Sequence, residues 1–166
     1  MGAFNLRSAL FLRNPVFGVE DGLVSTVGLL SGIAIAGVGR ETIFLTGIVL
    51  IFVEAFSMAA GSFLSEASVE EMHGGADDTR GSIAAGAVMF FSYFVAGFIP
   101  LAPYLIFPVE QAFPISVAGS VAALFLLGYW SGRNTRAAWR KALRMGLVGG
   151  IAILVGTVAG SLVSAV

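Results

Sequence analysis

Cysteine is absent from this 166-residue sequence, and histidine occurs once. Without cysteine the chain has no disulfides, thiolate metal ligands, iron–sulfur clusters or cysteine nucleophiles. Charge is also scarce, because 11% of the residues are Asp, Glu, Lys or Arg, against about 25% in a typical soluble domain. With a net charge of −1 the chain offers no basic field for phosphates, so no nucleic-acid partner is expected. No nucleophile and base are paired within the apolar runs, and we expect a protein that is not an enzyme.

Apolar residues are abundant, at 57% of the chain, and they fall into five long runs with few charges. A helix needs about 20 apolar residues to cross about 30 Å of hydrocarbon. The sequence therefore predicts an all-α membrane protein, a single transmembrane domain with five transmembrane helices. The first helix is expected to begin just after Pro15, and prolines separate the third span from the fourth. The predicted spans are residues 16–38, 42–66, 81–106, 111–132 and 145–166.

Lysine and arginine are unevenly distributed around these spans. Of the nine, only Arg40 lies on one side, and the other eight precede the first span or follow the second or the fourth. Positive charge in short loops stays cytoplasmic, so we expect a cytoplasmic N-terminus and a C-terminus on the opposite side. Tyr129, Trp130 and Trp139 then suit an interfacial belt on the cytoplasmic side, where the basic run 133–144 would touch anionic membrane lipid.

Acidic residues interrupt the apolar pattern of the first two spans. Glu54 lies near the middle of the second span, where a charge costs at least about 2.5–3.5 kcal/mol. At helical spacing Glu54 shares a face with Met58, and Asp21 starts a face on the first span that continues to Gly28 and Gly32. The two spans are antiparallel, so these faces can meet. The pattern predicts a metal site of Asp21, Met58 and Glu54, whose mixed oxygen and sulfur ligands suit Fe²⁺, Mn²⁺ or Co²⁺.

One protomer supplies few ligands for such a site. Gly28 and Gly32 form a GxxxG pattern, which lets helices approach closely, and a twofold axis at this face would double the ligand set. Structural roles are the alternatives for each residue. Met58 would then be a packing residue and Asp21 a helix N-cap, while Glu54 would hydrogen-bond across helices in a non-transporting scaffold or assembly subunit.

The short cytoplasmic loop predicted at residues 66–80 is acidic. Glu66, Glu70 and His73 would share a helical face if the second helix continued, and Glu70 and His73 have the ExxH spacing found in di-iron bundles. These three residues are further candidate metal ligands, at an entrance to the membrane. The alternative is a solvated helix exit that ends at Gly74 and Gly75.

The segments Gly18 to Ala34 (GVEDGLVSTVGLLSGIA) and Glu54 to Ser68 (EAFSMAAGSFLSEAS) resemble the first two helices of the vacuolar iron transporter family. The five-span layout is similar as well. The resemblance implies a homodimer that exports cytosolic Fe²⁺, and often Mn²⁺, in exchange for protons, with no permanently bound cofactor. The metal path would lie at the subunit interface. The aspartate of the family's DGL motif corresponds to Asp21, and its pathway methionine corresponds to Met58.

Two departures from the family pattern are visible. Asn14 and Leu50 stand where many members have acidic residues, and Glu54, one turn from Leu50, would replace the second of these. Only residues 66–80 stand where many eukaryotic members carry a long cytoplasmic metal-binding domain. The chain thus resembles a short, prokaryotic-type member, which implies the inner membrane of a prokaryotic cell, or the vacuolar membrane if the source is eukaryotic.

Overall fold

The computed structural model describes residues 6–72, 79–133 and 137–165, with side chains described from Arg13 onward. Within these ranges every regular element is a helix, and all except α4 are long and apolar enough to cross a membrane. Large apolar side chains on the outer surface, such as Phe56 at 70% and Leu147 at 65% exposure, suit contact with lipid. The predicted all-α class with five membrane-spanning helices is confirmed. The elements are α1 (Leu6–Ile35), α2 (Arg40–Met72), α3 (Thr79–Leu101), α4 (Pro103–Ile106), α5 (Val109–Gly132) and α6 (Ala138–Ser164).

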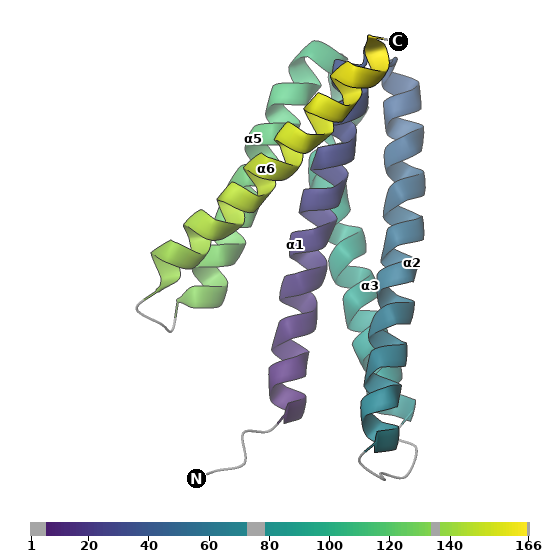
Figure 1. The fold of residues 1–166 in the computed structure, drawn as a ribbon, viewed down its shortest axis with the longest axis vertical. Coiled ribbons are helices and arrows are strands. Elements are labelled where there is room, and N and C mark those ends of the chain that lie inside the picture. Colours follow the sequence, from purple (N-terminus) through teal and green to yellow (C-terminus); the bar gives the residue numbers. More distant parts are fainter. Residues whose placement is uncertain (1–5, 73–78, 134–136, 166) are drawn as a thin grey trace.

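The long helices alternate in direction along the molecule (Figure 1). We call the end at which α1, α3 and α6 begin the N-end, and the opposite end, which holds the α1–α2 turn, α4 and the C-terminus, the C-end. Helix α1 is central, because it contacts α2, α3, α5 and α6. The α5–α6 pair leans away from α1 toward the N-end (Figure 1). Helices α1, α2 and α3 therefore form one group, and α5 and α6 form a pair that packs against α1.

The turn between α1 and α2 is closed by a glycine in the left-handed conformation. Gly37 has φ 76°, and its N–H donates to the carbonyl of Ala34 at 3.2 Å. The next N–H, from Val38, donates to the carbonyl of Ile33 at 3.3 Å. This pair of bonds is the Schellman motif, which satisfies the last carbonyls of a helix. It fixes the antiparallel return of α2 along α1.

Three helix limits differ from the predicted spans because of proline and of helix-forming polar residues. Helix α1 does not begin after Pro15 but runs through it from Leu6, so the expected start was wrong. Inside a helix, proline removes one N–H donor and its ring crowds the carbonyl four residues earlier, which disfavours but does not forbid a continuous helix. At the C-end, α3 stops at Leu101 and Pro103 begins the separate helix α4. Helix α6 begins at Ala138, well before residue 145, because its first turns hold basic residues that form helix but would not enter hydrocarbon.

A seam of glycines joins α1 to α6 within one chain. A Cβ atom on Gly32 would lie 2.7 Å from the carbonyl oxygen of Gly156, and Cβ atoms on Gly156 and Gly160 would overlap the carbonyl oxygens of Gly28 and Gly32. The GxxxG face of α1 is thus covered by a second GxxxG pattern on α6. The hypothesis that this face meets its twin in another protomer was wrong, because α6 already occupies it.

Candidate functional site

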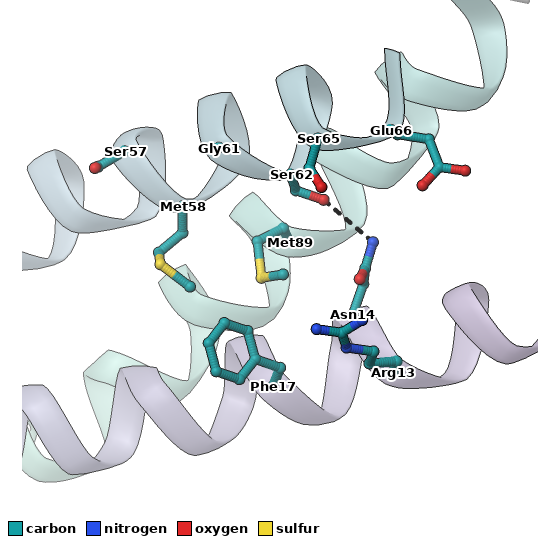
Figure 2. Close-up of a pocket in the computed structure, with 10 residues that line it drawn as sticks. All are labelled: Arg13, Asn14, Phe17, Ser57, Met58, Gly61, Ser62, Ser65, Glu66 and Met89. Carbon is teal, nitrogen blue, oxygen red and sulfur yellow. Dashed lines mark hydrogen bonds between the residues drawn. The ribbon is translucent and has the colours of Figure 1, made fainter. Parts of the chain in front are cut away.

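A cavity of about 290 Å³ lies among α1, α2 and α3 in the N-end half of the molecule. Phe17 from α1, Met58 from α2 and Met89 from α3 line it, and Figure 2 shows their side chains directed into the same space. The remaining lining residues are mostly polar or small: Arg13, Asn14, Ser57, Gly61, Ser62, Ser65 and Glu66. The cavity therefore combines two thioethers with hydroxyl, amide and carboxylate groups.

Small residues on α2 keep this cavity open. A Cβ atom on Gly61 would meet nothing within 4 Å, so the space beside this helix is not filled by a neighbour. On the other side of the cavity, the Asn14 side-chain amide donates a hydrogen bond to Ser62 Oγ at 3.1 Å (Figure 2). Asn14 is thus a neutral link between α1 and α2 at the position where an acidic residue was expected from the family pattern.

One helical turn beyond the cavity, each of the three helices carries a polar group. Four residues toward the C-end from Phe17, Met58 and Met89 lie Asp21, Glu54 and Tyr93 respectively. The Asp21 carboxylate interacts electrostatically with that of Glu54, and the Tyr93 hydroxyl is within electrostatic reach of both. Asp21 and Glu54 are thus close enough to influence each other, whereas a shared metal site at these residues stays a prediction. We call Asp21, Glu54 and Tyr93 the carboxylate layer.

A hydrogen-bond chain holds the α1 and α3 parts of this layer together. Ser25 Oγ donates to the carbonyl oxygen of Asp21 at 2.7 Å and also shares a hydrogen bond with the Tyr93 hydroxyl. Since the Ser25 proton is used on Asp21, Tyr93 is the donor to Ser25. Gly22 permits this approach, because a Cβ there would lie 2.6 Å from the Tyr93 carbonyl oxygen. The chain fixes Tyr93 beside the turn that presents Asp21.

Beyond the carboxylate layer the three helices close on each other. Thr26, Ile51 and Gly97 are all buried. A Cβ atom on Gly97 would lie 2.8 Å from Ile51 Cγ1 and 3.3 Å from Thr26 Oγ1, which leaves no space for a larger residue. Leu30 and Leu101 continue this apolar packing toward the C-end. The cavity thus lies on the N-end side of the carboxylate layer, and close packing lies on the C-end side.

The remaining predicted ligands lie apart from this layer. Glu66 lines the outer part of the cavity, whereas Glu70 accepts a hydrogen bond from Ser82 Oγ at 3.1 Å, which ties α2 to α3. His73 lies outside the described residues. Among the part of the chain that the structure describes, no three His, Cys, Asp or Glu side chains are grouped for a metal ion. Any metal held at Asp21 and Glu54 would need ligands of other kinds, or from a second copy.

Met89 and Tyr93 were missed from the sequence. Both lie on α3, which carries no acidic residue in its described length and matches no motif. One signal was available for Tyr93. Tyrosine in membrane helices gathers at the interfaces, so a tyrosine in the middle of an apolar run points to a polar partner inside the bundle.

Comparison with known proteins gives two results. The family model described as VIT family matches residues 12–80 and 66–161, which together span most of the chain. A protein of Oryza sativa subsp. japonica, named vacuolar iron transporter homolog 1, is 35% identical over 81 residues. That match covers 44% of this chain and 35% of the Oryza sativa protein, so it spans about a third of that relative's length.

Proposed function

Because this chain belongs to the VIT family, we propose that it is a proton-coupled transporter that exports Fe²⁺, and related divalent metals such as Mn²⁺, from the cytosol. It is a multi-pass integral membrane protein. We propose the inner membrane of a prokaryotic cell as its location, or the vacuolar membrane if the source is eukaryotic. The name of the Oryza sativa relative supports iron as the cargo. The observation that carries the proposal is the succession, on three helices, of an open thioether-containing cavity and a carboxylate layer.

The proposed route begins at the N-end, which the distribution of arginines assigns to the cytoplasm. A divalent ion would pass Glu66 and reach Met58 and Met89, whose soft sulfurs favour Fe²⁺ over Mg²⁺ or Ca²⁺. It would then bind between Asp21 and Glu54. The packing of Ile51 against Gly97 would close the route beyond this point.

Exchange for protons follows from the carboxylate layer. Two carboxylates that interact in a low-dielectric interior repel each other, and either a divalent cation or protons relieve that repulsion. Asp21 and Glu54 can therefore hold either a metal ion or protons, but not both at once. Alternation between these two occupants would couple metal export to proton entry.

A homodimer is part of the proposal. Besides Glu66 in the cavity lining, one chain offers two carboxylates, two thioethers and the hydroxyls of Tyr93 and Ser25 near the route. No third carboxylate is grouped with Asp21 and Glu54 among the described residues. A second copy facing the α1–α2 side of the cavity would complete the ligand set. Since α6 covers Gly28 and Gly32, the dimer contact would lie elsewhere than on that glycine face.

The test is Fe²⁺ entry into proteoliposomes driven by a proton gradient. Wild type is compared with Asp21→Ala, Met58→Ala and Glu54→Gln, and with Glu110→Gln as a control acid at the opposite end of the molecule. We expect the first three variants to lose most of the flux and the control to retain it. A wild type that moves no divalent metal would leave the scaffold alternative and end the transport proposal. Normal flux in all three site variants would show that these residues do not hold the metal, and would refute the proposed site.

A further inference from the structure

A second cavity, of about 450 Å³, lies between α1 and the first turns of α6. Helix α6 contributes three cationic side chains to its lining, those of Arg140, Lys141 and Arg144, and α1 contributes one carboxylate, that of Glu20. Lys141 interacts electrostatically with Glu20, while Arg140 and Arg144 are exposed. The residues that line this cavity therefore carry a positive charge that Glu20 only partly neutralises.

Aromatic residues place this cavity at the depth of lipid headgroups. Trp139 precedes Arg140 and packs against Tyr129, with ring centroids 5.9 Å apart, and against Phe125, at 5.4 Å. Tryptophan and tyrosine gather where hydrocarbon meets the polar headgroups. The guanidinium groups beside them lie within reach of lipid phosphates from the same leaflet.

The lining changes from charged to apolar along α6. Met145 and Val148 lie on the same side of the cavity as the cations, and Val148 is one turn, about 6 Å, further into the membrane than Arg144. Met145 is buried, and Val148 is 43% exposed. A cationic mouth above an apolar wall matches the phosphate and the first acyl carbons of a phospholipid. A small soluble anion would not contact this apolar wall.

We propose that this cavity binds one anionic phospholipid, with its phosphate beside Arg140, Lys141 and Arg144 and an acyl chain along Met145 and Val148. The lipid would touch both α1 and α6 at the end where the α5–α6 pair leans away from α1 (Figure 1). It would thus hold the two groups of helices together at the N-end, where the glycine seam does not reach. This site is independent of whether the chain transports metal.

The test measures lipid binding to the purified full-length chain in detergent by native mass spectrometry. Phosphatidylglycerol is compared with phosphatidylcholine, and glycerol 3-phosphate and inorganic phosphate are added separately as competitors. We expect phosphatidylglycerol to bind about tenfold or more tightly than phosphatidylcholine, and millimolar soluble phosphates not to displace it. Displacement by either soluble phosphate would show a site for free anions and overturn the lipid assignment.

Two double variants that remove the same amount of charge distinguish a specific lipid site from attraction by general surface charge. Arg140→Gln/Arg144→Gln should weaken phosphatidylglycerol binding about tenfold to thirtyfold, at roughly 1 kcal/mol per cation. Arg80→Gln/Arg133→Gln, which removes two arginines from the same end outside the cavity, should change it less than about twofold. Equal loss in both would mean that general surface charge attracts the lipid, and the proposal would fail.

A single substitution covers the case in which the first double variant does not fold. Glu20→Gln removes the carboxylate from the lining, so the phosphate should bind about fivefold more tightly. Unchanged or weaker binding of phosphatidylglycerol would show that its headgroup does not lie beside Glu20, and would refute the proposed location.

Discussion

The carboxylates of Asp21 on α1 and Glu54 on α2 interact electrostatically across two antiparallel helices of one chain. Tyr93 on α3 is within electrostatic reach of both. The proposed metal site is therefore concentrated in one turn of each of three helices, one turn beyond an open cavity.

Substitution of either carboxylate should weaken metal binding, and the two effects should not be additive. Asp21→Asn and Glu54→Gln are each expected to lower the affinity for Co²⁺, used as an air-stable probe, at least about tenfold. The double variant should lose less than the product of the two, because both groups hold the same ion. Isothermal titration calorimetry measures the Co²⁺ affinity of each variant, with Glu41→Gln as the control. Fully multiplicative losses would indicate two separate ions.

Replacing the thioethers should alter metal selectivity without altering packing. Leucine is similar to methionine in volume but lacks sulfur, so Met58→Leu and Met89→Leu should keep the fold. We expect each to reduce Fe²⁺ transport severalfold more than Mn²⁺ transport, because manganese prefers oxygen ligands. Met145→Leu, a buried methionine elsewhere, is the matched control. Equal effects on both metals would assign these methionines to packing.

Loss of the Tyr93 hydroxyl should loosen α3 from α1. Tyr93→Phe removes the donor to Ser25 while it leaves the ring in place, and a loss of about 1 kcal/mol in the free energy of unfolding is expected. Denaturant unfolding of the detergent-solubilised protein measures it. Tyr129→Phe, at an exposed position, should have no such effect. A stable Tyr93→Phe protein with normal metal affinity would contradict a positioning role for Tyr93.

The glycine seam between α1 and α6 should not tolerate even a methyl group. A Cβ on Gly156 would overlap the Gly28 carbonyl oxygen, so Gly156→Ala is expected to cost about 1–3 kcal/mol. On the same helix, a Cβ on Gly150 would meet nothing within 4 Å, and Gly150→Ala should stabilise the helix by about 0.5–1 kcal/mol. Thermal unfolding of both variants measures these two changes in stability. Equal melting temperatures would show that the helices do not approach as closely as described.

Accessibility of single cysteines can test both the cavity and the orientation, because the natural chain has none. Ser65→Cys lies in the cavity lining and should react quickly with a membrane-impermeant maleimide, whereas Ser120→Cys is buried and should not. With the N-end in the cytoplasm, Ser65→Cys should react in inside-out vesicles and stay unlabelled in intact cells. Labelling from outside intact cells would reverse the proposed direction of entry.

The sequence predicted the five helices and singled out Asp21 and Glu54 for a simple physical reason. Length and hydropathy decide which segments can span a membrane, and a charge in the middle of a span is conspicuous. Met89 could not be predicted in this way. Helix α3 is apolar on all sides, so its sequence carries no periodic signal to show which face turns toward α1 and which toward lipid.

The sequence also could not show which helices pack against each other. The GxxxG pattern on α1 indicates a close approach, and such an approach is present, but the pattern does not name its partner. Two chains and two helices of one chain satisfy it equally well. Gly156 and Gly160 on α6 became informative only when the fold placed them opposite Gly28 and Gly32.

The seam between α1 and α6 is a contact of backbone on backbone, with no side chains interlocked across it at Gly28, Gly32, Gly156 and Gly160. Interdigitated side chains lock two helices in one register, since any rotation must first separate them. The glycine seam therefore sets how closely α1 and α6 approach, but it does not fix their register. A buried cluster beside the seam, which joins Leu23 of α1, Leu124 of α5 and Met145 of α6, supplies the side-chain contacts that hold α5 and α6 in place on α1.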